Sequence, residues 1–132
     1  MASSKIIQNM TISITTDGAP EQTANIVANG AAAAASIAVA TDTTLVISDL
    51  ILGGLASAVW QLQQTNDGMT WFNIAQIDTL ANTGGTTPNS PMYSYYPGLT
   101  ITGGADVAIR MRVTTAGGAI AVIGTLRAYL EG

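Results

Sequence analysis

Hydrophobic and polar residues alternate along short segments of this chain, and turn signals separate the segments. Ile, Val, Thr and Tyr recur at every second position, which is the period of a strand with one buried face. Turn signals occur at the Gly-Gly pairs 53–54, 84–85, 103–104 and 117–118, at Asn66-Asp67-Gly68 and at Pro97-Gly98. No segment shows the i, i+3, i+4 apolar spacing of an amphipathic helix. The pattern therefore predicts an all-β protein.

The alternation also predicts where the strands lie. They are expected over Ile6–Thr15, Ser36–Ala40, Thr44–Leu52, Ser57–Thr65, Thr70–Thr79, Met92–Tyr96, Leu99–Thr102, Asp106–Thr115 and Ala119–Glu131. Asp17–Gly30 and Ala81–Pro91 are expected to be long loops. About eight strands in one small domain with polar turns are typical of a sandwich or a jelly roll. We therefore expect residues 1–132 to form a single domain, a jelly-roll-like antiparallel β-sandwich.

The turn signal Asn66-Asp67-Gly68 predicts a hairpin with a definite register. A three-residue loop with Gly68 in the left-handed conformation gives the pairs Thr65 with Met69, Leu62 with Phe72 and Trp60 with Ile74. The opposite face then carries Gln61, Gln63, Trp71 and Asn73. The apolar pairs are expected to face the core, and Trp71 is expected on a polar face outside it.

A second hairpin is expected at Gly117-Gly118. A two-residue turn pairs Ala116 with Ala119, Ile109 with Leu126 and Val113 with Val122. The other face then carries Arg110, Arg112 and Arg127 together. A three-residue loop would instead put Arg110 and Arg112 beside apolar residues, because a one-residue slip moves every side chain to the other face. The two-residue turn is therefore favoured.

The composition excludes several kinds of chemistry. The chain has no cysteine and no histidine. Disulfides, thiolate nucleophiles and iron–sulfur clusters need cysteine, and most transition-metal sites and Ser-His-Asp triads need histidine. The eight carboxylates are scattered, without the spacing of a calcium-binding loop. We therefore expect a protein that is not an enzyme and has no catalytic residue, cofactor or metal.

The charge and hydropathy patterns argue against nucleic acid and membrane as partners. The formal net charge is −4, and four basic residues are too few to displace counterions from a phosphate backbone. The most apolar stretch, Thr44–Trp60, contains Asp49 and Gly53-Gly54 and falls short of the about 20 apolar residues that a membrane-spanning helix needs. The first residues lack the apolar core of a signal peptide, so we expect synthesis in a cytoplasm.

The scarcity of charge points to assembly. Only 9% of the residues are charged, whereas about 25% is usual in a soluble domain. Surface charges of both signs keep isolated soluble proteins from associating with one another. Strand edges that lack charge tend to pair with other strand edges unless they are covered. A symmetric oligomer covers such edges. The composition therefore favours a component of an assembly.

Two groups of aromatic residues are candidates for contact with a partner. Trp71 is expected beside Gln61 and Gln63 and has two interpretations. It is either an exposed platform that contacts a sugar ring or a partner surface, or a side chain that a loop or a second sheet covers. Tyr93 and Tyr95 either form the rim of a ligand site or pack on one side of an edge strand.

The arginines form a third group of candidates. Arg110, Arg112 and Arg127 are three of the four basic residues and are expected on one face of one hairpin. Planar guanidinium groups bind carboxylates at two points, so this group is either a docking patch for an acidic partner or a solvated outer face.

The string Thr65-Asn66-Asp67-Gly68-Met69-Thr70-Trp71 resembles the Asp box of sialidases and related β-propellers. It lacks the residue between Asp and Gly in that pattern and occurs once, whereas Asp boxes are repeated. The Asp box is a structural hairpin motif, so the resemblance implies no catalytic residue. A propeller also needs far more chain than 132 residues.

The chain as a whole resembles the small structural proteins of tailed-phage virions, in particular the capsid decoration (cement) proteins. The segments that carry this resemblance are Met1-Ala2-Ser3-Ser4, Ala31–Ala40, the hairpin Val59–Gly68 with Thr70-Trp71, and Ile120–Glu131. The resemblance implies a jelly-roll-like sandwich, a homotrimer, and binding over junctions between subunits of the major capsid protein in the virion. The alternative is a carbohydrate-binding or receptor-binding module of the fibre-tip type, which would use Trp71 with Tyr93 or Tyr95.

Overall fold

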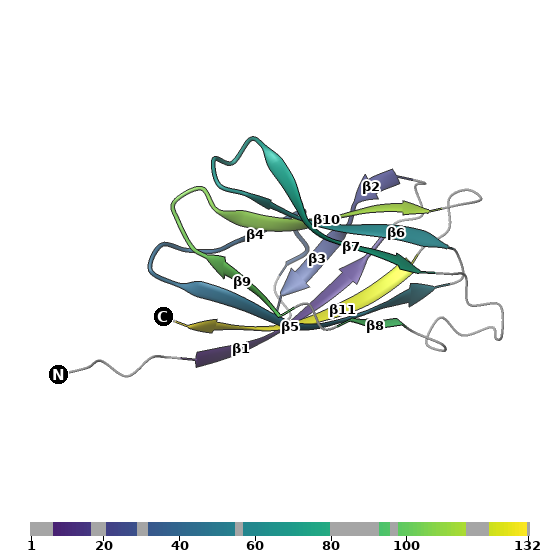
Figure 1. Ribbon diagram of the computed structural model, residues 1–132, viewed down its shortest axis with the longest axis horizontal. Coiled ribbons are helices and arrows are strands. Elements are labelled where there is room, and N and C mark those ends of the chain that lie inside the picture. The colour runs from purple at the N-terminus through teal and green to yellow at the C-terminus, as the bar shows by residue number, and fades with distance from the viewer. Residues whose placement is uncertain are drawn as a thin grey trace.

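A computed structural model describes residues 7–16, 21–28, 32–54, 57–79, 93–95, 98–115 and 122–131. Within these ranges the chain forms strands and no helix, and the strands make two antiparallel sheets that pack face to face (Figure 1). The strands are β1 (Ile7–Thr15), β2 (Glu21–Thr23), β3 (Asn25–Ala28), β4 (Ile37–Ala38), β5 (Thr44–Gly54), β6 (Ala58–Thr65), β7 (Trp71–Thr79), β8 (Tyr93–Tyr95), β9 (Leu99–Thr102), β10 (Ala108–Thr115) and β11 (Val122–Glu131). The all-β sandwich expected from the alternation is confirmed.

The strand order is that of a jelly roll. One sheet runs β3-β1-β11-β5, and β8 and β9 both pair with β5; the other runs β10-β6-β7, and β2 and β4 both pair with β10. If β2 with β4 and β8 with β9 are taken as two interrupted strands, and β3 as an addition at the edge, the described part of the chain has eight strands. Their orders are first-eighth-third-sixth and second-seventh-fourth-fifth, which two Greek keys produce.

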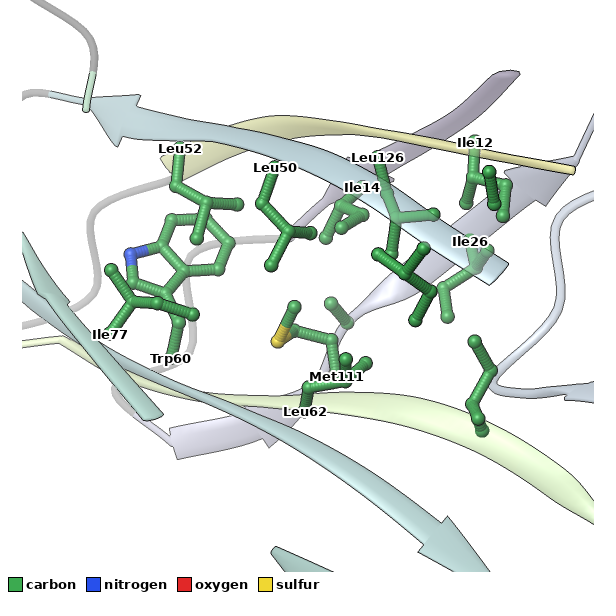
Figure 2. Packing of buried hydrophobic residues seen from close by; sticks show 14 of the residues in the cluster. Ile12, Ile14, Ile26, Leu50, Leu52, Trp60, Leu62, Ile77, Met111 and Leu126 are labelled. Carbon is green, nitrogen blue, oxygen red and sulfur yellow. The ribbon is translucent and has the colours of Figure 1, made fainter. Parts of the chain in front are cut away.

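The core lies between the sheets and contains one face of every long strand. Leu50 and Leu52 of the six-stranded sheet point toward Trp60 and Met111 of the five-stranded sheet (Figure 2). Trp60 is fully buried, and its indole Nε1 donates a hydrogen bond to Thr79 Oγ1 at 2.9 Å. The partner satisfies the polar atom of the largest core side chain, and full burial of each large apolar side chain contributes about 1.5–3 kcal/mol.

The predicted loop Asp17–Gly30 is wrong in part, because its described residues include β2 and β3. Ala24, between these strands, is fully buried, and its N–H donates to Met111 O at 2.8 Å. Ile26, two residues later, is also in the core. Polar residues flank these positions, and β2 and β3 have only three and four residues. The segment is therefore too short and too polar to show the alternating pattern of a strand with one buried face. The predicted loop Ala81–Pro91 lies outside the described residues.

The predicted register of the β6–β7 hairpin is also wrong. Thr65 pairs with Trp71 rather than Met69, and a bulge follows at Leu62/Gln63, so that Leu62 faces Ala75 and Trp60 faces Ile77. Phe72, expected in the core opposite Leu62, is 60% exposed. The five-residue turn explains the shift, because Met69 and Thr70 bind the Asp67 carboxylate instead of continuing the ladder.

The predicted hairpin between β10 and β11 does not form. β10 pairs with β2, β4 and β6, whereas β11 pairs with β1 and β5 in the other sheet. Ile109 and Leu126 therefore face the same core from opposite sheets and do not pair along a ladder. Both strands have a buried apolar face, and a sandwich buries such faces from opposite sides. The predicted turn at Gly117-Gly118 lies outside the described residues.

Candidate docking face

The outer surface of the five-stranded sheet carries a connected layer of polar side chains. Along β10, the buried Ile109, Met111 and Val113 alternate with the half-buried Arg110 and Arg112, so the arginines point away from the core. We call this surface the polar face; it consists of Glu21, Thr23, Gln61, Gln63, Trp71, Asn73, Gln76, Arg110 and Arg112. These side chains come from β2, β10, β6 and β7, which are neighbours in the sheet.

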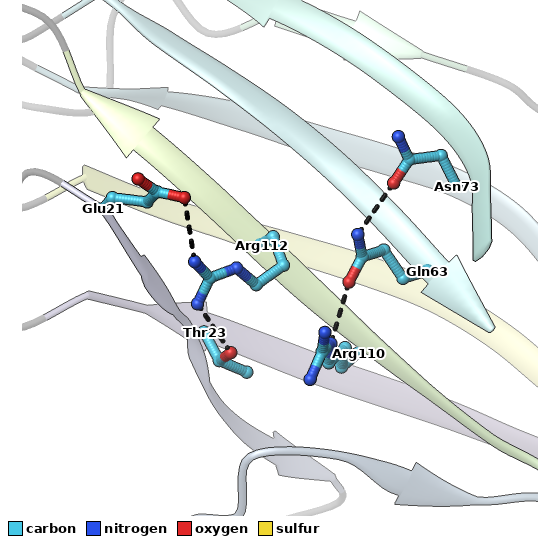
Figure 3. Close-up of polar contacts among 6 residues, drawn as sticks. All are labelled: Glu21, Thr23, Gln63, Asn73, Arg110 and Arg112. Carbon is cyan, nitrogen blue, oxygen red and sulfur yellow. Dashed lines mark hydrogen bonds and ion pairs between the residues drawn. The ribbon is translucent and has the colours of Figure 1, made fainter. Parts of the chain in front are cut away.

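Arg112 is bound to two residues of β2. Its Nη2 lies 3.0 Å from Glu21 Oε1, and its Nη1 donates to Thr23 Oγ1 at 3.1 Å (Figure 3). The pairing of β2 with β10 places Thr23 directly opposite Arg112. The Arg112 side chain is 30% exposed and that of Glu21 is 66% exposed, so the ion pair is screened by water and adds little to stability. Its effect is to hold the charge of Arg112 against an acidic group of the same chain.

Arg110 has different partners. Its Nε donates to Gln63 Oε1 at 2.8 Å, and its Cζ lies 4.2 Å from the centre of the Trp71 ring. Gln63 in turn donates from Nε2 to Asn73 Oδ1 at 2.7 Å (Figure 3). Burial, and then the positive charge of Arg112, lower the pKa of Arg110 below its usual value. Hydrogen bonding and stacking thus hold this guanidinium on the sheet without a carboxylate partner in the described part of the chain.

Trp71 lies where the sequence places it, on the glutamine and asparagine face. It is half-buried, and the Arg110 guanidinium lies over its ring. The expectation that Gln61, Gln63, Trp71 and Asn73 share a face is confirmed: Gln63 pairs with Asn73, and Gln61 Nε2 donates to Gln76 Oε1 at 3.2 Å. Of the two alternatives for Trp71, an exposed platform or a covered side chain, the structure shows an intermediate: the ring is half-buried, and Arg110 of its own sheet covers part of it.

Arg127 does not belong to the polar face, so the prediction that the three arginines share one face is wrong. It lies on β11 in the other sheet, and its Nε and Nη2 donate to Asp49 Oδ1 and Oδ2 at 3.1 and 2.8 Å. The Asp49 side chain is 11% exposed. A bulge at Arg127/Ala128 accompanies this pair, and Ser48 Oγ donates to the Arg127 carbonyl. The two-point contact fixes Arg127 to its own sheet.

Tyr93 and Tyr95 are not brought together with Trp71. They lie on β8, whose backbone pairs with Leu50–Leu52 of β5 in the six-stranded sheet. Trp71 begins β7 in the five-stranded sheet. Trp71 therefore shares neither a strand nor a sheet with Tyr93 or Tyr95, the residues with which it was expected to form a platform. The structure describes the backbone of these tyrosines and not their side chains.

The turn between β6 and β7 is organised by hydrogen bonds to the carboxylate of Asp67. Asp67 Oδ1 accepts hydrogen bonds from Thr70 N–H at 2.7 Å, Met69 N–H at 2.8 Å and Thr65 Oγ1 at 3.0 Å. These bonds, with the Thr70 N–H contributing most, lower the pKa of Asp67 to about 2. Gly68, at φ 78°, donates to Thr65 Oγ1. The geometry is that of a structural turn, the role expected from the Asp-box resemblance.

Two large apolar side chains at this hairpin are exposed, which the alternation of the sequence does not predict. Met69 is 83% exposed and Phe72 is 60% exposed. Phe72 was expected in the core, and only its pairing with Gln64 rather than Leu62 places it outside. The sequence contains a signal for this displacement, because Asp67 can form an Asx turn. In such a turn the Asp carboxylate binds the backbone N–H groups two and three residues further along the chain. The end of the hairpin therefore exposes two large apolar side chains to solvent.

The chemistry of the polar face is suited to binding. Its groups donate and accept hydrogen bonds, and the described residues contain no group of three or more His, Cys, Asp or Glu side chains that holds a metal. A hollow of about 280 Å³ lies further along the same sheet, lined by Ser57, Ala58, Val59, Asp78, Thr79, Thr114 and Thr115. The described part of the chain has no helix long and apolar enough to cross a membrane.

Comparisons with known proteins give no relative for this fold and face. No family model matches the chain, and the searches of curated proteins and of solved structures also found no match.

Proposed function

We propose that this chain is a non-enzymatic structural protein of a virion, which decorates the capsid and stabilises it by bridging subunits of the major capsid protein. The observation that carries the proposal is the polar face. Gln63, Asn73 and Arg110 are already ordered by hydrogen bonds to one another. Docking a partner on such a face costs less side-chain entropy than docking on free side chains, so a modest contact area is sufficient for binding.

The composition supports a role within an assembly. The chain is 9% charged, and β7, which has nine residues and ends the five-stranded sheet in the described part of the chain, carries Asp78 as its one ionic side chain. Edge strands that lack charge favour pairing with a further strand. A homotrimer would cover such edges and present three polar faces. Several modest contacts that engage at once hold far more tightly than one, because each bound face raises the effective concentration of the others.

The proposal is tested with purified capsids of the encoding virus, prepared without this protein. The purified chain is added, and the capsids are pelleted through a sucrose cushion. We expect the wild-type chain to co-sediment at saturable stoichiometry and Trp71→Ala to lose about tenfold in affinity, the range of an aromatic contact residue. Ser13→Ala is the matched control, because Ser13 is exposed on the outer face of the other sheet. Absence of saturable binding by the wild-type chain would refute the proposal.

The alternative, a carbohydrate-binding module, has less support from the geometry. A sugar stacks on an open aromatic face, and the Arg110 guanidinium already lies 4.2 Å from the centre of the Trp71 ring. The two tyrosines that were expected to complete the platform lie in the other sheet. A glycan array distinguishes the two functions, since a decoration protein would bind no glycan there and a carbohydrate-binding module would bind one through Trp71.

A further inference from the structure

The three arginines on the long strands differ in what their guanidinium groups already hold. Arg112 is paired with Glu21, and Arg127 with Asp49. Arg110 has neither an ion pair nor a hydrogen bond to a carboxylate within the described residues; its partners are Gln63 and the Trp71 ring. Among the described residues, two of the three positive charges are therefore paired with carboxylates of the chain, and the third has no such partner.

The Arg110 guanidinium is nevertheless held in a fixed position. The hydrogen bond from Nε to Gln63 Oε1 orients one edge of the group, and the Trp71 ring supports one of its faces. Gln63 is itself fixed by its bond to Asn73. The Nη atoms make no hydrogen bond to the described residues and so keep their donors for a ligand. Planar donors held in this way match the two oxygens of a carboxylate.

We propose that Arg110 is a carboxylate-binding residue of the polar face and that it receives an Asp or Glu side chain from an acidic segment of the docked partner. This inference rests on the proposed function and names the chemistry of the partner's contact. The charge around the site supports it, because Glu21, the one acidic residue of the polar face, is bound to Arg112 and does not occupy Arg110. The lowered pKa of Arg110 agrees with this view, since an incoming anion would compensate the unfavourable burial and repulsion.

A carboxylate fits this site better than the phosphate backbone of a nucleic acid. Nucleic acids are bound through many phosphate contacts, and the chain has only four basic residues, of which Arg112 and Arg127 are in ion pairs with carboxylates of the described residues. One oriented guanidinium beside a Trp ring suits a single side-chain carboxylate, because Trp shields one side of the ion pair from water and so strengthens it.

The experiment follows the arginine Nε–Hε and tryptophan Nε1–H signals of the ¹⁵N-labelled full chain by NMR. The probe is acetyl-hexaglutamate amide, and the matched uncharged probe is acetyl-hexaglutamine amide. We expect hexaglutamate to shift the signals of Arg110 and Trp71 in a saturable manner and to leave those of Arg127 in place, while hexaglutamine shifts none. A single-stranded oligonucleotide, such as oligo-dT of the same charge, serves as a phosphate probe. Equal shifts with hexaglutamine, or stronger binding of the oligonucleotide, would overturn the inference.

Matched variants assign the site. We expect Arg110→Gln to weaken hexaglutamate binding at least about tenfold, as loss of a charge-assisted two-point contact implies, and Arg112→Gln to change it less than about threefold. Arg110→Lys keeps the charge and loses the planar fork, so its affinity should lie between those of the wild type and Arg110→Gln. Unchanged circular dichroism spectra and urea midpoints confirm that the variants are folded. Equal losses for Arg110→Gln and Arg112→Gln would show that only general charge matters, against the inference.

The capsid assay separates this inference from the proposed function. If the wild-type chain binds capsids and Arg110→Gln binds equally well, the partner's carboxylate is not held by Arg110 and the inference fails while the proposed function stands. If hexaglutamate binds through Arg110 and the chain does not bind capsids, the carboxylate site stands and the proposed function fails.

Discussion

Arg110, Arg112 and Arg127 carry the same side chain, and their surroundings give each a different role. Asp49 is almost buried and receives two hydrogen bonds from Arg127, so this pair secures a carboxylate that would otherwise be costly to bury. Glu21 is well exposed, and its pair with Arg112 orients the side chains without adding much stability. Arg110, stacked on Trp71, has no carboxylate partner among the described residues, and under the inference drawn above its charge is directed at a docking partner.

Asp67 makes the stability of the protein depend on acidity. Hydrogen bonds to the Thr70 and Met69 N–H groups hold its folded pKa at about 2, below the value of 3.8 for a free side chain. Because the folded pKa is the lower one, its contribution to stability is complete above pH 3.8 and is lost as the pH falls through 2. We expect Asp67→Asn to have a shallower loss of stability between pH 4 and pH 2 than the wild type, measured as urea midpoints across this range.

Asn66→Ala is the matched control for this prediction. Asn66 lies in the same turn and carries no titrating group, so its removal can lower the midpoint but should leave the slope with pH as in the wild type. If Asp67→Asn instead kept the wild-type acid slope, the low pKa of Asp67 would have no part in acid unfolding.

At the scale of elements, the β6–β7 hairpin shows how a correct face can arise from an incorrect register. The predicted turn is two residues too short, and a shift by two keeps each side chain on its face. Gln63 and Trp71 therefore lie on the outer surface as expected. The bulge at Leu62/Gln63 then inverts the alternation for the rest of β7, which the sequence pattern does not reveal because Ile74, Ala75 and Ile77 are all apolar.

The separation of β10 from β11 has a different cause. Alternation shows that Ile109 and Leu126 are on buried faces, and it does so correctly. It does not show whether two such faces belong to one sheet or to two sheets that pack together, since both arrangements bury the same residues. Adjacent strands pair in most proteins, so the sequence favoured a hairpin. The grouping of Arg127 with the other arginines failed for this reason.

The end of β9 packs so closely against the turn before β5 that only glycine fits. A Cβ on Gly103 would lie 1.9 Å from the Ala40 carbonyl oxygen and 2.7 Å from that of Thr43. Both are backbone atoms, and Gly103 N–H donates to Thr43 O at 2.8 Å. We expect Gly103→Ala to lower the free energy of unfolding by about 3 kcal/mol, the upper part of the range for overpacking, as measured by urea denaturation.

Gly104→Ala provides the comparison for this element. Its Cβ would approach a methyl group of Val107 at 3.0 Å, and a side chain moves more easily than a backbone turn. We expect a cost below about 1 kcal/mol. Equal costs for the two variants would mean that the close approach at Gly103 does not constrain the fold.

For the whole molecule, the low charge and the place of β7 at the end of its sheet, within the described residues, make association the expected state. Under the proposed trimer, the mass measured by size-exclusion chromatography with light scattering at micromolar concentration is three times the 13.5 kDa of the chain. Moderate salt should leave this mass unchanged, because strand edges associate through backbone hydrogen bonds and apolar contacts rather than ion pairs. A constant mass of one chain would remove the argument from covered edges.

The position of β11 has a consequence for how the molecule forms. This strand, the last of those described, lies in the middle of its sheet, with β1 on one side and β5 on the other, and Ile7 pairs with Glu131. Neither neighbour can complete its ladder until residues 122–131 have been synthesised. Contacts this distant in sequence form slowly. During translation, the edges of β1 and β5 that pair with β11 therefore stay unpaired until β11 has been made. In this interval the nascent chain is most prone to pair wrongly with other nascent chains.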